Sequence, residues 1–154
     1  MRKYTSGFFI MCFLLFPYSS GMLLSESHAA GDTADQFLGS WSLVSFKDKN
    51  EQGETIDRYG KGAFGRIVYG ANGNMMVVLM RHGREDLQDP DFFSYTGSYD
   101  VDAAAGTVTH HIEACIAPSW VGVDRVRKFE MLDANRIALR PVEGTSELIW
   151  QREK

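Results

Sequence analysis

The feature that most constrains the fold is a succession of short apolar segments separated by turn residues. The clearest pair is Arg66–Tyr69 and Asn74–Met80, which flank an Asn72-Gly73 dipeptide. Asn-Gly between two apolar runs is the strongest short-range indication of a β-hairpin. No segment after residue 30 sustains the apolar period of 3.6 residues that is typical of an amphipathic helix. The chain is therefore predicted to be all-β.

Eight strands are predicted in this way, most of them joined by short connections. They cover residues 40–47, 66–69, 74–80, 96–102, 107–114, 122–132, 136–141 and 147–152. Eight antiparallel strands of this length close into an up-and-down barrel, because closure removes the exposed sheet edges. A barrel of this size either fills with side chains or holds one small ligand. The polar segment 81–93 is predicted to form a long loop or a helical turn with solvated carboxylates at Glu85, Asp86, Asp89 and Asp91.

Length, charge and missing motifs exclude several classes of protein. A chain of 154 residues accommodates one compact domain. The net charge of −4 provides no basic surface for DNA or RNA. The sequence contains no Gly-x-Ser-x-Gly, no glycine-rich phosphate loop followed by a helix, and no His-Glu-x-x-His. Hydrolases and nucleotide-dependent enzymes with these motifs are therefore not expected, and no cofactor is predicted.

The first 29 residues have the three-part layout of a secretory signal peptide. A basic start at Arg2-Lys3 precedes nine apolar residues, Phe8–Phe16, and Ser27 and Ala29 occupy the −3 and −1 positions of a cleavage site. A permanent anchor needs about 20 continuous apolar residues. We therefore expect a periplasmic or secreted protein with residues 30–154 as its mature domain and no stable membrane anchor. The alternative is an uncleaved anchor that continues through Met22-Leu23-Leu24.

An ordered set of motifs resembles the lipocalin-like domain family of bacteria and fungi. The first predicted strand opens with Gly39-x-Trp41, which is the lipocalin signature at that place. The remaining motifs follow in order at residues 65–75, 97–101, 108–111, 118–122 and 127–129. Together they extend over residues 36–152, although the Thr-Asp-Tyr motif of true lipocalins is missing. The resemblance implies a calycin-type barrel, and it implies that Trp41 closes one barrel end by stacking with a basic residue of the last strand, here Arg152.

Strand alternation predicts a polar cluster inside the barrel. On strand 107–114 the more apolar face carries His110, because alternate side chains share a face. Pairing this strand with 96–102 through a four-residue loop places Tyr99 opposite His110. A register that pairs His110 with Arg127 extends the row to a third strand, where Phe129 lies on the same face. Tyr69 is predicted to point into the same space, so these five residues form the candidate ligand site.

The same pattern admits structural interpretations. His110 is either a site residue or an interior histidine whose hydrogen bond is made by Tyr99. An inward Arg127 requires an acidic partner or an anionic ligand, since an unpaired buried charge is costly. No metal site is predicted: His110 and His111 face opposite ways, and His82 has no suitably spaced partner.

Two functions remain open at this point. The first is binding of a small, mostly apolar or amphipathic molecule with a polar or anionic end, which suits strands rich in Met and aromatic residues. The second is an isomerase or cyclase in which His110 acts as general acid and base, Tyr99 donates a hydrogen bond and Arg127 stabilises an anion. A third possibility, a structural or protein-binding role for the outer face, is neither supported nor excluded.

Overall fold

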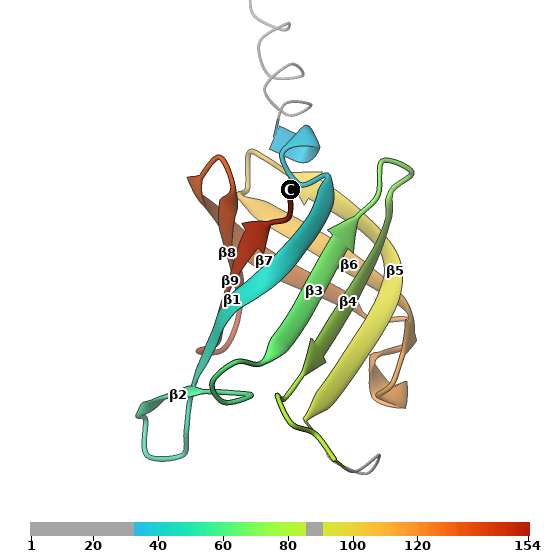
Figure 1. The fold of residues 1–154 in the computed structure, drawn as a ribbon. Helices are drawn as coiled ribbons and strands as arrows, with labels where there is room; N and C mark the ends of the chain where they lie inside the picture. Colours follow the sequence, from blue (N-terminus) through green and yellow to red (C-terminus); the bar gives the residue numbers. More distant parts are fainter. Residues whose placement is uncertain (1–32, 86–90) are drawn as a thin grey trace, which may run out of the picture.

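The structure, a computed structural model, describes residues 33–85 and 91–154 and consists almost entirely of β-strands (Figure 1). The predicted signal peptide lies outside the described residues. The strands are β1 (Gly39–Lys49), β2 (Thr55–Asp57), β3 (Phe64–Tyr69), β4 (Asn74–Met80), β5 (Phe92–Asp102), β6 (Thr107–Cys115), β7 (Asp124–Asp133), β8 (Arg136–Pro141) and β9 (Glu147–Arg152). A helical turn at residues 33–35 precedes β1, and the 3-10 helix η1 (Pro118–Trp120) connects β6 to β7. Among the described residues, no helix is long and apolar enough to cross a membrane.

Eight of the strands form a closed antiparallel barrel, as the sequence predicted. From β3 to β9 each strand pairs with the next one along the chain, and β1 pairs with both β3 and β9. The additional strand β2 pairs only with the end of β1, where Thr55 lies opposite Lys49. This strand was not predicted. Its three residues are all exposed, so it lacks the apolar alternation by which the other strands were recognised.

The core follows from the two-residue period of the strands. In β3 and β4 every second residue is buried, and the inward set comprises Gly65, Ile67, Tyr69, Met75, Val77 and Leu79. Side chains between them face solvent, since successive Cβ atoms point to opposite faces of a sheet. The two buried tryptophans, Trp41 and Trp150, contribute the largest side chains of this interior.

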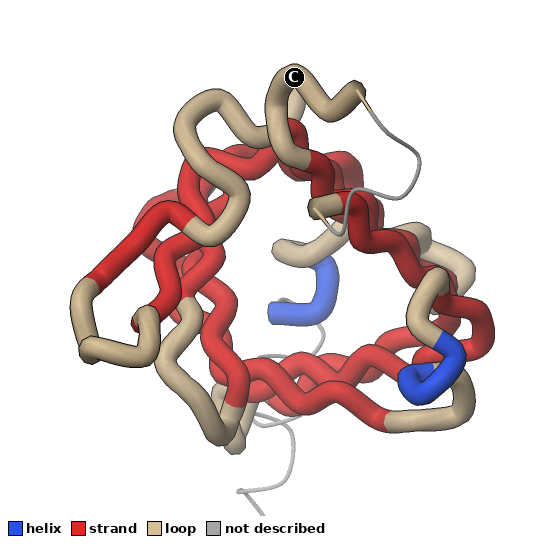
Figure 2. Tube along the Cα trace, turned by 90° about the horizontal axis from the view of Figure 1, so that it is seen from below, coloured by secondary structure: helices blue, strands red, loops and turns tan. Residues whose placement is uncertain are grey.

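The segment before β1 closes one end of the barrel. Figure 2, which looks along the barrel, shows the helical turn lying across the far end of the ring of strands. Phe37 is fully buried there and packs edge-to-face on Tyr69 and Phe129, with ring centroids 5.2 and 5.0 Å apart. The Arg152 guanidinium lies 4.1 Å from the centre of the Trp41 ring and donates to the carbonyl of Leu38. The stacking implied by the family resemblance is therefore confirmed.

The strand β5 begins four residues earlier than predicted. Its first residues complete a ladder with β4 in which Met80 lies opposite Phe92. Asp91, which was expected to be solvated, is only 7% exposed and forms an ion pair with Arg81. This pair joins the two ends of the β4–β5 connection and explains why the polar sequence does not prevent strand formation there. Asp86 and Asp89 lie outside the described residues.

Replacing Trp41 with Ala should lower the free energy of unfolding by about 3–5 kcal/mol, because it removes a fully buried ring and its contact with Arg152. Urea denaturation followed by circular dichroism measures this loss. The control is Phe64→Ala in β3, whose side chain is 44% exposed and should cost far less. Equal losses in the two variants would contradict the closing role assigned to Trp41.

Candidate functional site

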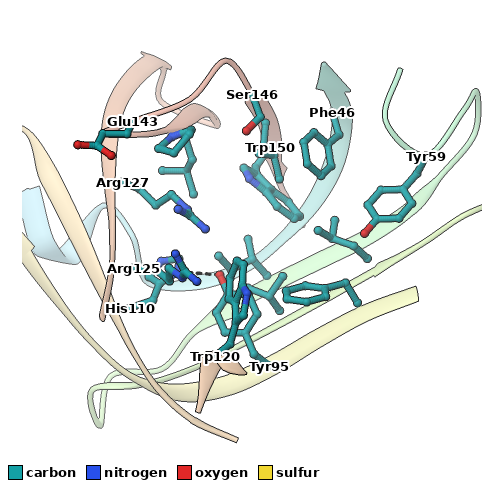
Figure 3. A pocket seen from close by; sticks show the side chains of 17 residues that line it. Phe46, Tyr59, Tyr95, His110, Trp120, Arg125, Arg127, Glu143, Ser146 and Trp150 are labelled. Atoms are coloured by element: carbon teal, nitrogen blue, oxygen red, sulfur yellow. Dashed lines mark hydrogen bonds between the residues drawn. The ribbon is translucent and has the colours of Figure 1, made fainter. Parts of the chain in front are cut away.

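A cavity of about 350 Å³ occupies the part of the barrel interior away from the Phe37 end. Figure 3 shows its lining side chains, which come from every strand of the barrel. Most of the lining is apolar or aromatic and comprises Phe46, Tyr59, Ile67, Val77, Leu79, Phe93, Trp120, Leu139, Pro141, Leu148 and Trp150. The polar groups are few and comprise Tyr95, His110, Arg125, Arg127, Glu143 and Ser146. An apolar pocket with a small number of converging polar groups is typical of small-molecule sites.

A buried Tyr–His–Tyr unit forms the polar centre of the barrel. The Tyr69 hydroxyl lies 2.8 Å from Nε2 of His110, and the Tyr95 hydroxyl lies 2.8 Å from Nδ1 of the same ring. His110 is 1% exposed. A neutral imidazole has one N–H donor and one acceptor nitrogen, so one tyrosine donates to the ring and the other accepts from it. Both ring nitrogens are therefore engaged within the protein.

The surroundings of His110 keep its ring neutral. Burial, together with the smaller effects of the Arg127 charge and of His111, lowers the pKa of His110 to about 3. Burial also raises the pKa of the Tyr95 hydroxyl to about 12, against the opposing charge of Arg127 and its hydrogen bond to that hydroxyl. The pKa of Tyr69 is raised well above its usual value, chiefly by burial. All three groups are uncharged near neutral pH, so Arg125 and Arg127 are the cations that face the cavity.

Strand pairing brings these groups together, with one difference from the predicted register. Tyr99 lies opposite His110 as predicted, but His110 pairs with Arg125 and not with Arg127. The shift arises because Gly122, with a φ of 77°, turns the chain so that its N–H donates to the carbonyl of Ile112, which brings β7 two residues further along β6. A shift of two residues preserves the facing of side chains, so both arginines still point inward (Figure 3).

The histidine next in sequence is part of a different environment. His111 points outward, and its ring nitrogens lie 2.9 Å from the Asp100 carboxylate and 2.7 Å from the Asp124 carboxylate. These hydrogen bonds raise the pKa of His111, with Asp124 making the larger contribution. Within the part of the chain that the structure describes, no group of three or more His, Cys, Asp or Glu side chains is arranged to hold a metal ion.

Several donors in the cavity have no partner in the protein. Among residues 33–85 and 91–154, no carboxylate forms an ion pair with Arg125 or Arg127. The Nε of Arg125 and the indole Nε1 of Trp150 are buried and make no hydrogen bond. The Arg125 guanidinium instead lies 3.9 Å from the centre of the Trp120 ring. Unpaired buried donors of this kind are costly and indicate a place for an acceptor.

The five residues of the predicted ligand site are placed in two groups. His110 and Arg127 line the cavity. Tyr69 lies behind His110, Tyr99 packs on Tyr69 at 4.8 Å and donates to the Gly70 carbonyl, and Phe129 packs on Phe37 at the closed end. The expected hydrogen bond between Tyr99 and His110 is thus replaced by hydrogen bonds between His110 and both Tyr69 and Tyr95. The binding role predicted for these five residues stays a prediction.

Sequence reasoning did not assign Tyr95, Arg125, Trp120 or Trp150 to the site. Tyr95 had a usable signal, since it shares the inward face with Tyr99 once the predicted strand is extended by one residue. Gly97 permits this extension, because a Cβ there would overlap the His111 carbonyl at the β-bulge. Arg125 also had a signal, because it lies two residues before Arg127 on the same strand and therefore points to the same face. Trp150 had no such signal, because its unpaired indole N–H exists only in the folded barrel.

Comparison with known families defines the class of protein. The sequence model of the lipocalin-like domain family matches residues 38–153, nearly the whole described part of the chain. The chain therefore belongs to the lipocalin-like domain family, which confirms the resemblance inferred from its motifs. A lipocalin-like barrel is in general a ligand-binding barrel, and members of this architecture hold small hydrophobic molecules in the interior.

Comparison with individual proteins adds little. No curated protein matches the chain. A solved structure of a redesigned β-barrel is 16% identical with a TM-score of 0.44, and the alignment covers 79% of this chain and 95% of that one. A crystal structure of a DUF4847 family protein from Bacteroides vulgatus is 13% identical with a TM-score of 0.45, covering 77% and 94%.

Acid should destabilise the protein through His110. Its pKa is about 3 in the folded barrel and 6.5 without the barrel around it, so the unfolded chain binds the extra proton between these values. The His110 contribution is complete above pH 6.5 and decreases as pH falls toward 3, by up to about tenfold in the unfolding equilibrium constant per pH unit. Urea titrations of wild type and His110→Gln at several pH values measure the difference.

The control for this titration is His111→Gln, one residue away on the outer face. The raised pKa of His111 means that its contribution is present at low pH and decreases as pH rises through that pKa. The two variants should therefore change the pH profile in opposite directions. A His110→Gln profile parallel to that of wild type would show that His110 is not held neutral in the fold.

Proposed function

We propose that this protein binds a small, mostly apolar molecule with an anionic end inside the barrel. The observation that carries the proposal is that Arg125 and Arg127 face an otherwise apolar cavity without an ion-pair partner among the described residues, and that Arg125 Nε and the Trp150 indole N–H make no hydrogen bond. A ligand carboxylate or comparable anion would accept hydrogen bonds from these groups and neutralise charge that the protein leaves unpaired.

The two sides of the cavity support an oriented ligand. The cationic side is formed by β7, which carries Arg125 and Arg127, and Figure 3 shows both guanidinium groups turned into the cavity. The opposite side is apolar and comprises Phe46, Ile67, Val77, Leu79 and Phe93. A ligand would therefore place its anion against β7 and its hydrocarbon part against β1 and β3–β5. The cavity volume of about 350 Å³ is at the lower end for ligand sites, which favours a single chain or a small ring system.

The arrangement of His110 favours binding over the alternative of an isomerase or cyclase. A general base needs a free nitrogen directed at the substrate and a pKa near the working pH. Both ring nitrogens of His110 are bonded to buried tyrosines, and its pKa of about 3 makes it a weak base. Tyr99, the proposed donor, is turned to the Gly70 carbonyl. The His110 unit instead supports the site by holding the Tyr95 hydroxyl beside Arg127.

The cellular location is a separate proposal that depends on the sequence of residues 1–29. We infer that this segment directs export to the periplasm or the medium and is removed after Ala29. Expression of the full chain in a Gram-negative bacterium, followed by fractionation and N-terminal sequencing, tests it. Soluble periplasmic protein beginning at Ala30 is expected. Full-length protein retained in the membrane would support the uncleaved anchor.

Decanoate, a hydrocarbon chain that ends in a carboxylate, is the probe for this site. Arg127→Gln should weaken decanoate binding by at least about tenfold, because hydrogen bonds to charged groups contribute about 1.5–3 kcal/mol. Decanol, which has the same chain and no charge, should bind both proteins with similar affinity. Isothermal titration calorimetry measures the four constants. The control is Lys128→Gln, since Lys128 is the exposed neighbour on the same strand.

If decanoate and decanol bind wild type with the same affinity, or neither binds, the barrel has no anion subsite of the kind described. Thermal melts of each variant establish that a lost affinity is not a lost fold. If Lys128→Gln weakens decanoate binding as much as Arg127→Gln does, the effect arises from the change in net charge and not from a contact with Arg127.

A further inference from the structure

The wall of the barrel is incomplete between β7 and β8. The pairing of these strands ends at Arg127 and Pro141, so the first three residues of β7, Asp124–Val126, pair only with β6. Proline has no N–H to extend the ladder, and after Pro141 the chain leaves β8 in the loop 142–146. The hydrogen-bonded pairing of β7 with β8 therefore stops at Arg127 and Pro141, and beyond this pair the two strands are not paired with each other.

A surface hollow of about 540 Å³ lies over this gap. It is bordered by residues 124–127 and 141–143. Four of its residues, Arg125, Arg127, Pro141 and Glu143, also line the interior cavity. The interior cavity and the surface hollow thus adjoin across these shared side chains, at the place where β7 and β8 are not paired, and this place is called the β7–β8 opening.

The charged side chains on the inner and outer sides of this opening have opposite signs. Arg125 and Arg127 are half-buried and turned into the barrel, whereas Asp124 and Glu143 are exposed on the outer side of the hollow. In Figure 3 the Glu143 carboxylate lies at the edge of the cavity and is directed away from the centre, on the same side as Arg127. Asp124 bonds to His111, while Glu143 forms no ion pair with any residue that the structure describes.

We propose that the β7–β8 opening is a second subsite for the outer part of a zwitterionic head group. This inference rests on the proposed function and names the class of ligand: a single-chain amphiphile whose anion adjoins the chain and whose cationic group follows the anion. The hydrocarbon chain occupies the apolar cavity, the anion lies at Arg125 and Arg127, and the cation passes through the opening to Glu143. This placement gives Arg125, Arg127 and Glu143 each a ligand charge of opposite sign and leaves the ligand's cation in contact with water.

The test compares two probes that share a decyl chain and a single negative charge. Decyl sulfate ends at its anion, whereas decylphosphocholine carries a trimethylammonium group beyond its phosphate. Both are titrated calorimetrically below the concentrations at which they form micelles. Wild type should bind decylphosphocholine at least as tightly as decyl sulfate. Glu143→Lys should weaken decylphosphocholine at least about tenfold and leave decyl sulfate unchanged or tighter, because the substitution repels only the outer cation.

The control is Glu51→Lys, an exposed carboxylate in the β1–β2 connection whose substitution alters net charge by the same amount. It should change neither affinity. Wild type that binds decyl sulfate but not decylphosphocholine would overturn the inference and leave the proposed function standing. Equal weakening of both probes by Glu143→Lys would also overturn it. Failure of decanoate and decyl sulfate to bind at all would instead contradict the proposed function.

Discussion

The pairing of the first long strand with the last one is the interaction on which the rest of the structure depends. Because β1 bonds to both β3 and β9, the eight long strands form a closed ring and enclose an interior. The same contact brings Arg152 over Trp41 and lets it hold the carbonyls of the segment that covers one end. Closure thus produces one filled end around Phe37 and leaves the other part of the interior for the cavity.

The Tyr–His–Tyr unit separates these two parts. Tyr69 faces the aromatic packing around Phe37, and Tyr95 faces the cavity, with His110 bonded to both. Because the unit is uncharged near neutral pH and both ring nitrogens of His110 are hydrogen bonded, it fills the middle of the barrel without a buried charge of its own. The cavity's cations that form no ion pair with a described residue, Arg125 and Arg127, both belong to β7. The two cations that we propose as the anion site therefore lie on one strand, and His110 is proposed to support them through its hydrogen bond with Tyr95.

The sequence predicted most of the fold and part of the site. The Asn72-Gly73 hairpin, the closed eight-stranded barrel and the inward facing of His110 all followed from local patterns, and the Trp41–Arg152 contact followed from the family resemblance. Four features did not follow: the strand β2, the early start of β5, the two-residue register shift of β7 and the partnership of Tyr95 with His110. Each depends on hydrogen bonds or ion pairs between neighbouring strands or strand ends that meet only in the folded chain, such as the Arg81–Asp91 pair.

What the sequence alone determined is which side chains share a face, because the two-residue period of a strand follows from local backbone geometry. That period placed Arg125 and Arg127 on one face with Phe129, whichever register the strands adopted. Only the tertiary structure decided which groups meet and which remain unpaired. Trp150 and Arg125 each have a buried N–H without a hydrogen-bond partner, and the pairing of β7 with β8 ends at Pro141. Both features exist because eight strands of unequal length close around one space. The pattern of residues along one strand does not show where hydrogen bonds to neighbouring strands and side chains will be missing.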